Sequence, residues 1–310
     1  MVERSADLAP NDPGAPGEAA DQAFAARGAV LRAAVALVAA VALYVPILYY
    51  MVLHWSHVED YSHGFLIVPL AVFFAWERRD ELRQASIKPS WLGLFPLVLG
   101  SLTLAIGRLG TELMNMRVSF VLTLIGLVLL LLGRRVFRIL AFPLLFLFLM
   151  IPLPESLLNV VAFPLQLIAA DLAVNGLFWL GIPALREGNI IHLANTSLFV
   201  ADACSGLRSL MALITLGVVF AYFFRKGLVE RGLIVLSAIP IAILVNAFRV
   251  GLTGILTYRF GEQVAKGWIH ETQGLFTFGI AFLLLLAEAS LLSKLRTRSR
   301  RRGDPAEVQS

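Results

Sequence analysis

Residues 201–224 read ADACSGLRSLMALITLGVVFAYFF, a short polar start followed by a long apolar run. A helix needs about 20 mostly apolar residues to cross a bilayer, and this run is long enough. Similar runs recur along almost the whole chain, which has a mean hydropathy of +0.80 and only 15% charged residues. This composition excludes an ordinary soluble enzyme and predicts an all-α integral membrane protein.

The apolar runs predict about eight transmembrane helices within one membrane domain, residues 29–293. Residues 1–28 are rich in Ala, Pro, Gly and acidic side chains and are expected to form a disordered cytoplasmic tail, whereas 294–310 form a basic cytoplasmic tail. The expected spans are residues 29–50, 63–77, 91–108, 118–133, 138–153, 205–224, 232–250 and 271–293.

The distribution of basic residues predicts the orientation in the membrane. With the N-terminus inside, 19 of the 26 Lys and Arg residues fall in inside segments and 5 in outside segments, while Arg208 and Arg249 lie within spans. Basic residues accumulate on the cytoplasmic side, so both termini are expected there. Because these residues form short clusters between apolar runs, the net charge of +5 does not indicate nucleic acid as a partner.

The segment between spans five and six is expected to lie on the outer face. Residues 155–181 are apolar with a polar stripe, which predicts a short interfacial or re-entrant helix, because one full crossing would invert the basic loops that follow. Residues 187–203 alternate in short β-branched runs and predict a small β-hairpin that leads into Cys204.

Cys204 is the only cysteine of the chain, so it is either an inert packed side chain or a free nucleophile. Its neighbours Asp202 and Ser205 are polar, and polar groups at membrane depth usually serve a function. In the predicted topology, Arg249 and His270 reach the same outer level from the next two spans. Nearby cations lower the pKa of a thiol, an imidazole can transfer protons, and a guanidinium can bind an oxyanion.

Each of these residues also has a simpler interpretation. Arg249 alone could extend to the membrane surface, and an isolated histidine at a helix start is often an interface residue. Asn246, one turn before Arg249, could support it or pair with a backbone group. Residues 60–64, which include His63, form a polar outer segment that we expect at the mouth of the site. The spacing of His54, His57 and His63 does not favour a metal site, and no cofactor is expected.

The motifs Ala-x-x-Cys-Ser-Gly-Leu-Arg-Ser, Asn-x-x-Arg and His-x-x-x-Gly, with Tyr-Ser-His-Gly at 61–64 and Ile-Pro-Leu-Pro at 151–154, resemble the exosortase/archaeosortase family over residues 40–290. One departure is Asp202, where many relatives have Glu. The resemblance implies a cysteine-dependent peptidase or transpeptidase with the catalytic residues Cys204, Arg249 and His270. We further expect Asp202, Ser205, Asn246 and His63 to be supporting or substrate-binding residues.

The resemblance further implies the setting of the reaction. The enzyme would lie in the bacterial cytoplasmic (inner) membrane, surrounded by lipid, with its active site on the outer, periplasmic face. It would cut secreted proteins at a C-terminal sorting signal of the PEP-CTERM type: a Pro-Glu-Pro motif, an apolar helix and a basic tail. The new C-terminus would pass to an unknown acceptor nucleophile, often in bacteria that make exopolysaccharide. Two alternatives are a non-enzymatic transporter or exopolysaccharide-export component, and a protease that only hydrolyses.

Overall fold

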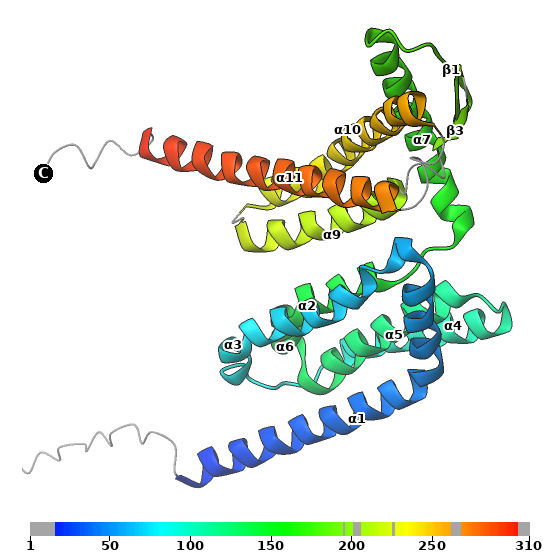
Figure 1. Ribbon diagram of the computed structural model, residues 1–310. Helices are drawn as coiled ribbons and strands as arrows, with labels where there is room; N and C mark the ends of the chain where they lie inside the picture. Colours follow the sequence, from blue (N-terminus) through cyan, green and yellow to red (C-terminus); the bar gives the residue numbers. More distant parts are fainter. Residues whose placement is uncertain (1–15, 195, 201–205, 225–226, 262–267, 303–310) are drawn as a thin grey trace, which may run out of the picture. The chain divides into compact units, whose positions relative to one another are not determined.

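The computed structural model describes residues 16–194, 196–200, 206–224, 227–261 and 268–302. It is mainly helical, with one small antiparallel sheet (Figure 1). The chain forms two compact units. The first comprises residues 1–54 and 64–152, and the second comprises residues 55–63 and 153–310.

The first unit is built from the long helix α1 (Pro16–His57) and the helices α2 (Gly64–Glu77), α3 (Arg79–Arg83), α4 (Leu94–Leu109), α5 (Leu113–Leu127) and α6 (Arg134–Phe146). Short 3-10 or π segments adjoin α4, α5 and α6 at Trp91–Gly93, Val128–Leu132 and Leu147–Met150. The short segments next to α4 and α5 approach closely where Gly93 meets Leu130: a Cβ on Gly93 would lie 2.3 Å from the Leu130 nitrogen. Glycine is therefore required at this crossing.

A buried hydroxyl network joins α1 to α5 within the first unit. Ser119 Oγ donates to Tyr44 Oη at 3.0 Å, and Tyr44 Oη lies 3.1 Å from Thr123 Oγ1. Tyr44 and Ser119 are at most 1% exposed. Since buried polar groups are costly unless they are paired, this network specifies how α1 packs on α5.

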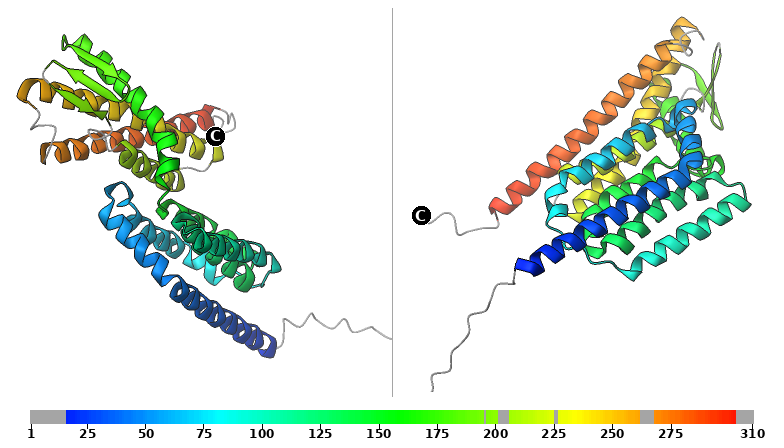
Figure 2. Two further views of the ribbon diagram at one scale, coloured as in Figure 1. Left: turned by 90° about the vertical axis from the view of Figure 1, so that its right-hand side faces the viewer. Right: turned by 90° about the horizontal axis from the view of Figure 1, so that it is seen from below.

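The second unit contains α7 (Glu155–Trp179), strands β1 (Ala184–Glu187), β2 (Ile190–Leu193) and β3 (Ser197–Phe199), and helices α9 (Gly206–Phe224), α10 (Leu228–Phe260) and α11 (Trp268–Arg302). The 3-10 turn η1 (Glu59–Tyr61) also belongs to it and contacts α9. The strands pair antiparallel in the order β1-β2-β3, next to α7 (Figure 2, left). Arg186 on β1 forms an ion pair of 3.2 Å with Asp171 on α7.

Two hydrophobic cores divide the second unit along α10. Residues of α9, α11 and the first half of α10 form one core, with Leu213, Ile234 and Leu285 fully buried. Residues of α7, the sheet and the second half of α10 form the other, with Ile191 and Val200 fully buried. Val245 belongs to the first core and Val250 to the second, so the two cores meet on α10 between these residues.

The described residues agree only in part with the predicted membrane topology. Six helices are long and apolar enough to cross a membrane: Arg27–His57, Trp91–Leu109, Leu113–Leu132, Ala162–Trp179, Leu228–Phe260 and Thr272–Leu292. The exact count of eight is not confirmed. Helix α2 has 14 residues and spans about 21 Å, which is shorter than a bilayer core of about 30 Å.

Two details differ from the expected elements. The segment predicted as a short interfacial helix is α7, with 25 residues, and its place at the outer face stays a prediction. The predicted hairpin is a sheet with a third strand, because β1 begins at Ala184, before the alternating run. Helix α1 begins at Pro16, inside the segment expected to be disordered, and residues 1–15 lie outside the described residues.

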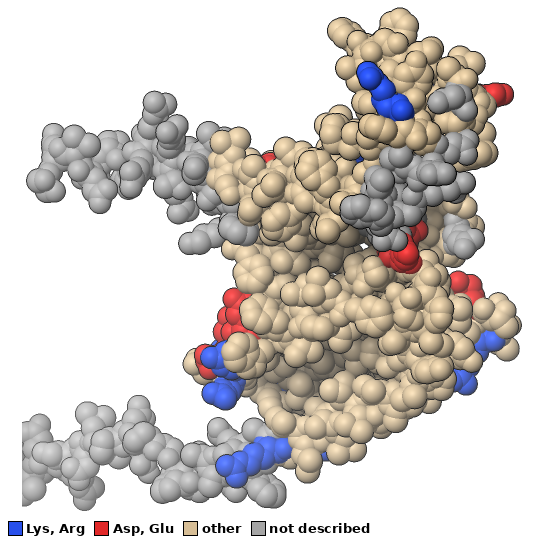
Figure 3. Space-filling model, in the orientation of Figure 1, with Lys and Arg blue, Asp and Glu red and all other residues tan. Residues whose placement is uncertain are grey.

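Charged side chains gather at the ends of the helices and leave most of the visible surface uncharged (Figure 3). The exposed residues include many large apolar side chains on α1, α4 and α10, such as Val38, Phe95 and Leu244. Hydrocarbon rather than water suits this surface, and the protein is a multi-pass membrane protein.

Candidate active site

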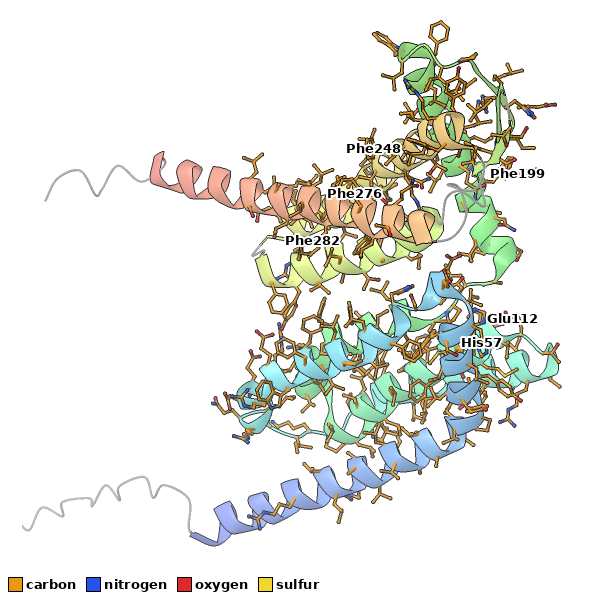
Figure 4. The ribbon with its side chains drawn as sticks, viewed as in Figure 1. His57, Glu112, Phe199, Phe248, Phe276 and Phe282 are labelled. Atoms are coloured by element: carbon orange, nitrogen blue, oxygen red, sulfur yellow. The ribbon has the colours of Figure 1, made fainter. Side chains whose placement is uncertain are left out.

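A buried polar stripe runs along one side of α10. Arg249, Thr253 and Thr257 follow one another at a spacing of four residues and are at most 4% exposed. In contrast, Phe248, next to Arg249, is 52% exposed (Figure 4). Asn246 extends the stripe by one turn and is half-buried. A charged side chain buried in an apolar helix is costly and marks a candidate functional site.

Helix α11 presents its own polar residues to this stripe. Gln273 and Thr277 are 7% and 3% exposed. The Thr253 hydroxyl lies 2.9 Å from both the Arg249 carbonyl oxygen and Gln273 Oε1. Thr277 Oγ1 donates to the Gln273 carbonyl oxygen at 2.7 Å, within its own helix. The Thr253–Gln273 contact therefore ties α11 to the backbone of α10 at Arg249.

The Arg249 guanidinium lies against the backbone of α11 at Gly274. A Cβ on Gly274 would be 3.2 Å from Arg249 Nη2 and 3.4 Å from Cζ. Any larger residue at position 274 would thus push on the guanidinium. This contact explains why glycine suits the fourth residue after His270.

The contacts between α10 and α11 also set the level of His270. Asn246 and Thr277 line one cavity, and Arg249 contacts Gly274 one step further along. The two helices run in opposite directions. Four residues after Arg249 on α10 is Thr253, and four residues before Gly274 on α11 is His270, so Thr253 and His270 lie at the same level. The backbone of His270 therefore lies about 6 Å along the helix axis from the level of Arg249. Its side chain lies outside the described residues.

Two cavities meet at Asn246. One, of about 10 Å³, is lined by Asn246, Arg249, Thr277 and five apolar residues of α9, α10 and α11. The other, of about 20 Å³, lies between α7, α9 and α10 and is lined in part by Gln166 and Asn246. Three polar side chains therefore open into the space on the α9 side of Arg249. Phe282 on α11 closes the core further along by packing on Phe220 of α9, with ring centroids 5.7 Å apart (Figure 4).

The remaining predicted residues are placed only in part. Cys204, Asp202 and Ser205 lie outside the described residues. They fall between β3, which ends at Phe199, and α9, which begins at Gly206. Both of these elements belong to the second unit, which also contains Arg249.

His63 lies in the same unit, directly after η1. Its Nδ1 is 3.1 Å from the Asp60 carbonyl oxygen, and Tyr61 Oη donates to the Leu153 carbonyl oxygen at 2.9 Å. Because η1 contacts α9, this segment lies beside the helix that follows Cys204. Among the described residues, no group of three His, Cys, Asp or Glu side chains lies close enough to hold a metal ion.

Sequence reasoning missed Thr253, Gln273 and Thr277. A signal for them exists: polar residues recur every three or four positions within the apolar runs of α10 and α11, on the faces that carry Arg249 and His270. That period indicates two buried polar faces. Which residues of one face meet those of the other depends on the packing of the two helices.

Comparison with known proteins places this chain in a family. A family model described as transmembrane exosortase matches residues 55–287, which is most of the chain. No curated protein and no solved structure matches it. The matched region contains every candidate site residue named above, and the chain belongs to the transmembrane exosortase family.

Proposed function

We propose that this protein is a membrane-embedded cysteine transpeptidase that removes the C-terminal sorting signal of secreted proteins. The observation that carries the proposal is the buried Arg249, held against α11 at Gly274, one turn from the level of His270. Exosortases are generally peptidases or transpeptidases. This arrangement supports a fixed cationic donor on α10, with the proposed proton-transfer residue on the neighbouring α11.

The proposed reaction has two steps. The Cys204 thiolate attacks the scissile carbonyl, a C–S bond forms, and the carbonyl oxygen becomes an oxyanion that the Arg249 guanidinium binds. The C–N bond then breaks, and His270 gives its proton to the leaving amine. In the second step His270 takes a proton from the acceptor, whose nucleophilic atom attacks the thioester and restores the thiolate.

The length of α10 supports an outer-surface position for this chemistry. Arg249 follows Leu228 by 21 residues, so it lies about 32 Å along the helix, close to the thickness of a bilayer core. The cytoplasmic side is expected at Leu228, next to the basic residues Arg225, Lys226 and Arg231. The remaining turns of α10, together with α7 and the sheet, would then form a cap at the outer surface.

The substrates we propose carry a Pro-Glu-Pro motif, an apolar helix and a basic tail. The bilayer would align such a helix with the spans and present the motif at the level of Arg249. Membrane insertion would therefore already have lowered the entropy cost of positioning the substrate. Exposed apolar side chains on α1 and α4 of the first unit, and on α10 of the second, are surfaces on which such a helix can pack in lipid.

The test is the mass of the product made from a co-expressed secreted protein with this C-terminal signal. Cleavage at the motif by the wild-type chain, and none by Cys204→Ala, is the expected result. A product heavier than the hydrolysed chain by the mass of an acceptor indicates transpeptidation, whereas addition of water alone indicates a protease. Equal cleavage with and without Cys204 would refute the proposed function.

A further inference from the structure

The Gln273 carboxamide is a buried polar group whose oxygen contacts a hydroxyl and whose nitrogen has no hydrogen-bond partner among the described residues. Gln273 is 7% exposed, and its Oε1 lies 2.9 Å from the Thr253 hydroxyl. Among the described residues, its Nε2 has no hydrogen-bond partner. Most buried polar atoms in folded proteins have a partner, and an exception calls for an explanation such as strain, a catalytic role or a bound water or ion.

Gln273 is linked to Arg249 through the contact between α10 and α11. It directly precedes Gly274, whose missing side chain is what lets the guanidinium reach α11. Through Thr253 it is also linked to the Arg249 carbonyl oxygen. The same side chain thus contacts both helices of the pair, which restricts where its Nε2 can point.

We propose that Gln273 Nε2 is a second hydrogen-bond donor, beside Arg249, to the acyl oxygen of the substrate. This inference rests on the proposed function. As the thiolate adds to the carbonyl carbon, the oxygen gains negative charge and accepts one N–H from Gln273 and one or two from Arg249. No proton leaves Gln273, because an amide acts here only as a donor. A site that holds two fixed donors binds the oxyanion more strongly than the ground-state carbonyl.

Two substitutions separate this role from a purely structural one. Gln273→Glu keeps an oxygen that can accept from Thr253 but removes the amide donor. Gln273→Met has a similar length and removes both. Ser290→Ala is the control, since Ser290 lies on the same helix and its hydroxyl donates to the Leu286 carbonyl oxygen one turn earlier.

The experiment measures single-turnover cleavage, by the full-length protein in lipid nanodiscs, of a purified protein that carries the proposed C-terminal signal. It also measures alkylation of Cys204 by iodoacetamide, a displacement that forms no oxyanion. We expect cleavage to fall about a hundredfold in both Gln273 variants, the usual effect of losing one oxyanion donor. Alkylation of Gln273→Met and cleavage by Ser290→Ala should stay at the wild-type rate.

Three results would overturn the proposal. Wild-type cleavage by Gln273→Glu would mean that only the contact with Thr253 matters, or that a water molecule satisfies Nε2. A parallel fall of cleavage and alkylation in Gln273→Met would mean that Gln273 acts on the thiol or on the fold. If the wild type does not cleave, or Cys204→Ala still does, the proposed function fails and the role of Gln273 fails with it.

Discussion

Gly274 and Arg249 are complementary in shape: the guanidinium occupies the space that a side chain at position 274 would take. The contact is close, with 3.2 Å between the site of a Cβ and Nη2. It joins the helix that carries the proposed oxyanion donor to the helix that carries the proposed base. Small changes here should alter the geometry of the site without unfolding the helix pair.

The first prediction concerns Gly274→Ala. The new methyl group forces the guanidinium to move by a few tenths of an ångström, and misplacement of a catalytic group by about 1 Å costs about a hundredfold in rate. We expect cleavage to slow by about tenfold. The variant should nevertheless be at least as resistant to thermal unfolding, because alanine is favoured over glycine in a helix by about 0.5–1 kcal/mol.

Gly279→Ala is the matched control for Gly274→Ala. It lies on the same helix, and nothing lies within 4 Å of its Cβ position. It should gain the same helix stability and keep the wild-type cleavage rate. Equal rates in the two variants would show that the position of the guanidinium is not critical.

The second prediction concerns the orientation of the chain. Cys204 is the only cysteine, so a membrane-impermeant maleimide reports one site without background. We expect it to label Cys204 in spheroplasts, where the outer face is open to the reagent, because 19 basic residues lie in the predicted inside segments against 5 outside.

Two exposed loop positions calibrate this labelling in the Cys204→Ala background. Ser86→Cys lies in a predicted inside loop and should be labelled only in inverted vesicles. Thr111→Cys lies in a predicted outside loop and should be labelled in spheroplasts. If Cys204 behaves like Ser86→Cys, the orientation is wrong, and the site faces the cytoplasm.

The third prediction concerns the nucleophile and the base. Cys204→Ser should abolish cleavage as fully as Cys204→Ala, because a serine hydroxyl has a far higher pKa than a thiol and needs a stronger base. His270→Ala should remove cleavage as well. Immunoblots of membrane fractions measure substrate accumulation, and the amount of inserted enzyme controls for folding. Normal maturation in Cys204→Ser would point to a nucleophile other than a thiolate.

Much of the fold follows from the sequence because long apolar runs have few alternatives in a bilayer. The helices α1, α10 and α11 each contain a predicted span, and α2, α4, α5, α6 and α9 each overlap one. The C-terminal end of α10 was harder to predict. Its polar residues Thr253 and Thr257 suit a loop in composition, yet both are buried, and Val250, Ile255 and Tyr258 of the same stretch pack with α7 and the sheet. Tertiary packing, not local hydropathy, extends this helix to Phe260.

The candidate site was predictable residue by residue but not as an arrangement. A guanidinium within an apolar run is conspicuous, and so is a lone thiol among polar neighbours. Gln273 is not, because it lies among other polar residues at the start of the predicted span. Its proposed role depends on how α10 and α11 pack, with the Thr253 hydroxyl next to its Oε1 and the Arg249 guanidinium against Gly274.

The last prediction separates the two roles of Arg249. If Arg249 only anchored α10 at the membrane surface, lysine would replace it well, because both side chains carry one charge on a long stem. The burial of Arg249, at 4% exposed, and its flat contact with Gly274 favour a role for the planar guanidinium instead. A guanidinium offers several donors in a fixed plane, whereas an ammonium is a compact point charge that is more strongly hydrated.

We therefore expect Arg249→Lys to insert normally and to cleave about a hundredfold more slowly than the wild type, almost as slowly as Arg249→Ala. Arg259→Lys is the control, since Arg259 is an exposed arginine of the same helix. It should cleave at the wild-type rate. Near-normal cleavage by Arg249→Lys would reduce Arg249 to an anchor and leave Cys204 and His270 as a dyad, with the acyl oxygen bound by other donors.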